Sequence, residues 1–124
     1  MSGLLDDGIN FFNSGHYFEA HEAWEDLWRE TSGDLRLFYQ GLIQTAVGLH
    51  HLSRGNMVGA RAQLSKAIAK LDERSGQATA IDAGALQRVL RKVLDELDVA
   101  SPGQVRIARL KSKHDVVESE GTLE

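Results

Sequence analysis

Helical spacing is the feature that most constrains what this chain can fold into. Apolar residues recur at three- and four-residue intervals along most of its length, and the single proline, Pro102, lies beyond them. Such spacing gathers the apolar side chains on one face of each helix. No segment shows strand alternation between turn signals, apart from a short hint near Val105 and Ile107. The pattern predicts an all-α fold.

Turn signals divide the chain into five predicted helices. Glycine and asparagine accept the left-handed conformation that often follows a helix end, and Asp34 and Asp82 are suitable N-caps. The third helix is apolar around most of its circumference, so we expect it at the centre of the fold. Residues 75–80 are predicted as a loop. The predicted helices cover residues 2–13, 17–30, 35–53, 56–74 and 83–97.

Residues 12–20 have an internal echo in residues 52–60, forty positions later. Each copy contains a helix end, a glycine turn, an aromatic residue or methionine, and then a small residue. Tetratricopeptide-like hairpins use the same order, although their usual period is about 34 residues. We therefore expect a compact bundle of four to five helices arranged as antiparallel helical hairpins. It would form one domain over residues 1–100, with an extended or disordered tail over 101–124.

Composition excludes several classes of function. The 124 residues suit one domain, and the formal net charge of -4 argues against a nucleic-acid binder, which usually has a basic face. With no cysteine, the chain has no disulfide, no catalytic thiolate and no cysteine-based zinc site. The sequence shows neither a signal peptide nor an apolar run of about 18 residues. We expect a cytoplasmic protein that binds neither membrane nor nucleic acid.

The second predicted helix contains the candidate catalytic and metal-binding residues. At about 100° per residue, His21 lies at the centre of an aromatic face, with Glu25 one turn further on and Glu22 at the border. Burying either a histidine or a carboxylate costs free energy unless the group is paired. In a structural interpretation, His21 and Glu25 bond each other or a backbone carbonyl and tie the second helix to the third.

Two other interpretations make the same residues functional. In the first, His21 and Glu25 chelate Zn, Mn or Fe, and Glu22, His50 or His51 completes the ligand shell. The second histidine of the His-Glu-x-x-His metalloprotease motif is missing. In the second interpretation, His21 and Glu25 are an acid–base pair in a metal-free pocket.

The third predicted helix adds a polar stripe of Gln40, Gln44 and His51. We favour a face that touches water or the termini of the chain, with a hydrogen-bonding wall opposite His21 as the alternative. His50 lies on a different face, so at most one of the two neighbouring histidines is expected to meet His21. Helix phase does not say which.

The order of these motifs resembles the bacterial and archaeal family called domain of unknown function 309 (DUF309). The resemblance covers about residues 5–72 and includes the His21–Trp28 helix, Gly41–Gln44 with His50–His51, and Gly55–Asn56. It implies a small all-helical bundle and no activity, because the family has none assigned. The positions of interest that it implies are His21, Glu22, Glu25, Trp28, Gln44 and His50.

Two classes of function follow from these residues. The first is an interaction or scaffold module with a buried His/Glu cluster, which binds another protein or a second copy and needs no cofactor. Its expected signature is a large exposed apolar patch, and its candidate binding residues are Glu22, Trp28, Gln44, His50 and His51. The alternative is a small hydrolase, metal-assisted or acid–base, that uses His21 and Glu25. The lack of an accompanying nucleophile or phosphate-binding loop favours the module.

Overall fold

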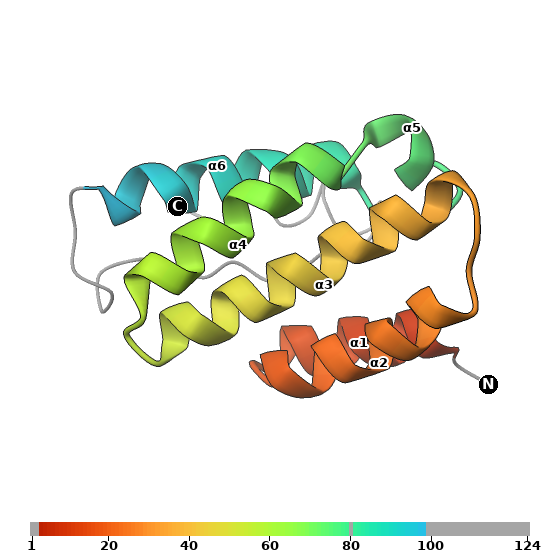
Figure 1. The fold of residues 1–124 in the computed structure, drawn as a ribbon, viewed down its shortest axis with the longest axis horizontal. Coiled ribbons are helices and arrows are strands. Elements are labelled where there is room, and N and C mark those ends of the chain that lie inside the picture. Colours follow the sequence, from red (N-terminus) through yellow and green to blue (C-terminus); the bar gives the residue numbers. More distant parts are fainter. Residues whose placement is uncertain (1–2, 80, 99–124) are drawn as a thin grey trace, which may run out of the picture.

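The computed structural model describes residues 3–79 and 81–98, and these form six helices (Figure 1). The all-α prediction is confirmed, and the helix beyond the expected four to five is a single turn. Predictions for Ser2, for Val105 and Ile107 and for the tail over 101–124 lie outside the described residues. None of the described helices has the length and apolarity needed to cross a membrane. The helices are α1 (Leu4–Asn13), α2 (Tyr17–Arg29), α3 (Asp34–Ser53), α4 (Met57–Lys70), α5 (Glu73–Gly76) and α6 (Ala83–Leu97).

The first four helices pack on one another in the order of the chain. α1 packs on α2, α2 on α3 and α3 on α4, while α6 runs beside α4 (Figure 1). α3 therefore lies between α2 and α4, and Phe38, Leu42 and Ala46 of this helix are fully buried. The predicted central position of the third helix is confirmed.

The echo in the sequence is a repeat of structure. Gly15 and Gly55 both adopt the left-handed conformation, with φ of +83° and +80°. The residue after each glycine donates its backbone N–H to the carbonyl oxygen five residues earlier, at 2.8 Å in both turns. The α1–α2 and α3–α4 hairpins therefore close with the same turn.

The two hairpins also pack their helices in the same way. A Cβ added at Gly8 of α1 would overlap the indole Nε1 of Trp24, and one added at Gly48 of α3 would lie 2.6 Å from Leu64 Cδ2. Trp24 and Leu64 are both fully buried. Both the glycines and their large partners are forty positions apart, so each hairpin brings its helices together by fitting a large side chain against a glycine.

The predicted fourth helix is too long. α4 ends at Lys70 because the backbone of Leu71 turns out of the helix, which keeps the Leu71 side chain fully buried. Asp72 then accepts a hydrogen bond from the backbone N–H of Arg74 at its Oδ1 (3.2 Å) and starts α5. The first two residues of the predicted 75–80 loop therefore belong to α5.

One of the two predicted N-caps is confirmed. The Asp82 Oδ1 accepts a hydrogen bond from the Ala85 N–H at 3.0 Å and caps α6. Asp34 is not a cap but the first helical residue, and the N-cap is Gly33, with φ of +79°. The acidic side chain instead lies in the first turn of α3, where the helix dipole favours a negative charge.

We predict that Gly8→Ala lowers the free energy of unfolding by about 1–3 kcal/mol, because the new methyl group would collide with a buried indole. Gly48→Ala should cost less, since it meets the end of a flexible leucine side chain. Gly3→Ala, where a Cβ meets nothing within 4 Å, is the matched control and should cost less than about 0.5 kcal/mol. Urea unfolding followed by circular dichroism measures all three, and equal stabilities would contradict the packing described.

Candidate interaction surface

Trp24, not His21, is at the centre of the buried face of α2. Trp24 and Ala20 are fully buried, and the indole N–H of Trp24 donates to the Leu5 carbonyl of α1 at 3.2 Å. The Phe12 ring lies 5.9 Å from the Trp24 ring. The sequence predicted His21 at the centre of the aromatic face of this helix, and the structure shows that the most deeply buried part of that face is centred on Trp24. The sequence shows which residues share a broad aromatic face but not which part of that face the neighbouring helices cover.

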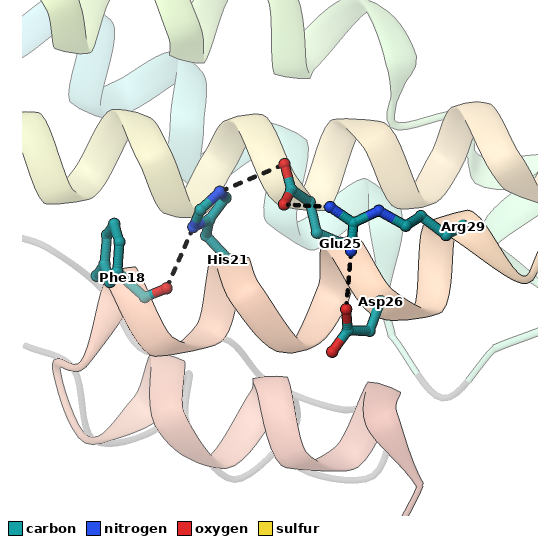
Figure 2. A network of polar contacts seen from close by, with 5 residues as sticks. All are labelled: Phe18, His21, Glu25, Asp26 and Arg29. Carbon is teal, nitrogen blue, oxygen red and sulfur yellow. Dashed lines mark hydrogen bonds and ion pairs between the residues drawn. The ribbon is translucent and has the colours of Figure 1, made fainter.

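His21 lies at the border of the buried face, with 20 % of its side chain exposed. Its Nε2 is 3.5 Å from Glu25 Oε2, and its Nδ1 is 3.3 Å from the Phe18 carbonyl oxygen (Figure 2). Both of these partners are acceptors, so which ring nitrogen donates depends on the tautomer of the imidazole. The contacts expected in the structural interpretation are present. They lie within α2 and do not tie it to α3.

The polar network continues along the surface of α2 (Figure 2). Glu25 Oε1 accepts a hydrogen bond from Arg29 at 3.3 Å, and Arg29 also donates to Asp26 Oδ1 at 2.9 Å. Exposed ion pairs of this kind contribute about 0–1 kcal/mol. Arg29 and Asp26 were not among the predicted site residues, although the three- and four-residue spacing of the charges could have revealed them. The network orients Glu25 more than it stabilises the fold.

His50, rather than His51, approaches α2. The Phe18 side chain is 49 % exposed, and its ring centroid lies 5.3 Å from that of His21 and 5.7 Å from that of His50. His51 lies toward α4, where its Nδ1 is 3.4 Å from the Asn56 side-chain nitrogen. The His50 and His51 rings are 6.3 Å apart. Phe18, His21, His50 and His51 thus form a continuous chain of rings, which we call the Phe18 surface.

Trp28, at the other end of α2, contacts a side chain of α3. The Arg36 guanidinium lies 3.8 Å from the centroid of the Trp28 ring, in a cation–π contact that links the end of α2 to the start of α3. Trp28 is partly buried. Its role as a binding residue stays a prediction. Trp24, Phe38 and Tyr39 are buried core residues.

The polar stripe of α3 is partly buried. Within the described part of the chain, Gln44 Oε1 is buried and has no hydrogen-bond partner. The next residue, Thr45, is buried as well, and its hydroxyl donates to the Gly41 carbonyl at 2.9 Å. His51 of the same stripe lies toward α4, so it does not form a wall opposite His21.

The candidate metal ligands do not converge. In the described ranges, no three histidine, aspartate or glutamate side chains lie close enough together to hold a metal ion. His21 and His50 meet on the Phe18 ring, and Glu22 is exposed. Of the predicted metal ligands, His21 and Glu25 are the two whose side chains contact each other directly, at 3.5 Å.

Tyr17 and Tyr39 stay neutral near neutral pH. Burial raises the pKa of Tyr17 and of Tyr39 above the usual value for a phenol. The Tyr17 ring packs edge-on against Phe12 at 5.1 Å. Neither side chain supplies a phenolate to the network around His21 near neutral pH.

The side of α2 that faces solvent is acidic. Its exposed carboxylates recur at three- and four-residue spacing, which places them in one stripe along the helix. This stripe borders the Phe18 surface and gives that part of the molecule a negative charge. The stripe consists of Glu19, Glu22, Asp26 and Glu30.

Comparison with known proteins finds a family whose matched region includes α2. Residues 5–63 match the family model described as "Domain of unknown function (DUF309)". The resemblance seen in the sequence is confirmed. The DUF309 match includes all of α1 except Leu4, the whole of α2 and α3 and the first half of α4, and so contains the whole Phe18 surface.

Two relatives have similar sequences but no described function. "Uncharacterized protein YpuF" from Bacillus subtilis (strain 168) is 29 % identical over 112 residues, which cover 88 % of this chain and 64 % of the relative. An "Uncharacterized protein" from Aquifex aeolicus (strain VF5) is 24 % identical over 104 residues, which cover 83 % of this chain and 31 % of the relative. The chain thus spans less than two thirds of the length of either protein.

We predict that His21→Ala lowers the free energy of unfolding by less than about 1 kcal/mol, because its polar contacts are partly exposed and lie within one helix. Trp24→Phe should cost about 1–3 kcal/mol, because it removes a buried N–H donor and leaves a void. Thermal and urea unfolding of both variants measure the difference. A larger loss for His21→Ala than for Trp24→Phe would show that His21, rather than Trp24, holds the hairpin together.

Proposed function

We propose that this domain is a protein-interaction module, and that its binding site is the Phe18 surface with the neighbouring acidic side of α2. The exposure of Phe18 is the observation that carries this proposal. An aromatic side chain that is 49 % exposed between two histidine rings leaves apolar area that a partner can cover. Aromatic residues of this kind often dominate the free energy of binding at interfaces.

The charge beside Phe18 indicates the chemistry of the partner. Residues 17–30 contain five carboxylates and a single cation, Arg29. Charge complementarity therefore favours a basic segment that also carries an apolar side chain to cover Phe18. Before a partner binds, Arg29 already holds the Glu25 side chain in place through a hydrogen bond. Glu25 therefore loses less conformational freedom when the partner binds.

The geometry of His21 supports this function over a hydrolase. A general base needs a ring nitrogen that can reach the proton of a substrate or of a water molecule. Both ring nitrogens of His21 already have partners within α2. The names of the relatives suggest no reaction, and the cytoplasm stays the predicted location.

We expect Phe18→Ala to weaken binding of the partner about tenfold without loss of fold, because it removes the exposed aromatic anchor. Leu37→Ala is the matched control, since Leu37 is 56 % exposed but lies near the opposite end of α3 from His50. Pull-downs with quantitative mass spectrometry should find a protein with a basic segment that wild type and Leu37→Ala retain and Phe18→Ala loses. Identical retention by all three would contradict this function for the Phe18 surface.

A further inference from the structure

We propose that the basic segment that docks on the acidic side of α2 is helix α4 of a second copy of this chain. This inference rests on the proposed function and adds the identity of the partner. The contact joins two different faces, the outer side of α2 in one copy and the outer side of α4 in the next.

The outer side of α4 suits close approach by another helix. Val58, in its first turn, is 81 % exposed, the largest fraction among the exposed large hydrophobic residues of the described chain. Ala62, Ser65 and Ala69 follow it at three- and four-residue spacing and are exposed as well. Small side chains let a second helix come near, so the longer side chains of α2, with Phe18 at one end, can lie across them.

The charges of the two helices are opposite. Residues 3–34, which include α1 and α2, contain eight carboxylates and one cation. Residues 35–71, which include nearly all of α3 and the whole of α4, contain five cations and no carboxylate. Among the cations of α4, Arg61 pairs with Asp98 at 2.6 Å, whereas Lys66 is exposed. Lys66 is thus placed to meet a carboxylate of another molecule.

The hairpin repeat shows which positions of α2 and α4 carry opposite charges. With the forty-residue offset that relates the two hairpins, Phe18 corresponds to Val58, Asp26 to Lys66 and Glu30 to Lys70. Equivalent positions on α2 and α4 therefore carry opposite charges. Within one chain α3 separates the two helices, so these charges do not meet there (Figure 1). Between two copies they can.

A contact between unlike faces has a consequence for assembly. Each copy keeps one free α2 face and one free α4 face, so association continues head to tail. Because opposite charges supply much of the attraction, assembly should weaken as salt rises from about 50 to about 500 mM.

Sedimentation velocity of the full chain at increasing protein concentration tests the proposal. Wild type should form species larger than a monomer at low salt. Glu22→Lys with Asp26→Lys reverses the α2 face, and Ala62→Glu with Lys66→Glu reverses the α4 face. Each double variant alone should associate at least about tenfold more weakly than wild type. Arg88→Glu, on the exposed side of α6, is the control and should associate like wild type.

Mixing the two double variants gives the decisive result. The first keeps a native α4 face and the second a native α2 face, so the mixture should associate more strongly than either variant alone. The two reversed faces are also opposite in charge, so association of the mixture can continue beyond a pair. Circular dichroism of each variant establishes that it is folded. A monomeric wild type at low salt, or a mixture that stays monomeric, overturns the proposal. If a protein other than this chain still binds through a basic segment, and its binding is lost in Phe18→Ala, the proposed function stands and only the second copy is excluded as the partner.

Discussion

The close fit of a large side chain against a glycine is the contact on which the rest of this structure depends. Trp24 fills the space left by Gly8, and Leu64 fills the space left by Gly48. Each contact joins the two helices of a hairpin, and α3, shared between α2 and α4, joins the hairpins. Because interiors are packed as densely as organic crystals, even one added methyl group at these glycines must displace its neighbours.

The orientation of Trp24 also determines what α2 presents to solvent. With Trp24 and Ala20 turned inward, Phe18 and His21 lie at the edge of the buried face, and the carboxylates of the helix point outward. α3 then places His50 against Phe18. The exposed aromatic ring and the acidic stripe therefore result from the same rotation of α2 that fills the core, and the proposed interaction with a basic segment rests on their combination.

The sequence predicted the helices, their order and the glycine turns, because periodicity and turn residues are local signals. It did not predict the end of α4, since the burial of Leu71 is a tertiary constraint that overrides helix propensity. The His21–Glu25 pair was predicted from its spacing, but the exposure of His21 was not, because a helical wheel does not show how the neighbouring helices cover a face. For the same reason, the choice between His50 and His51 needed the structure.

The most direct measurement of the central claim, that α2 and α4 form complementary binding faces, is the change of backbone amide chemical shifts with protein concentration at low salt. The account predicts shifts at residues 18–29 of α2 and 58–70 of α4, which are reversed by added salt, and none on the outer side of α6. Concentration-independent spectra, or shifts confined to α6, would contradict it.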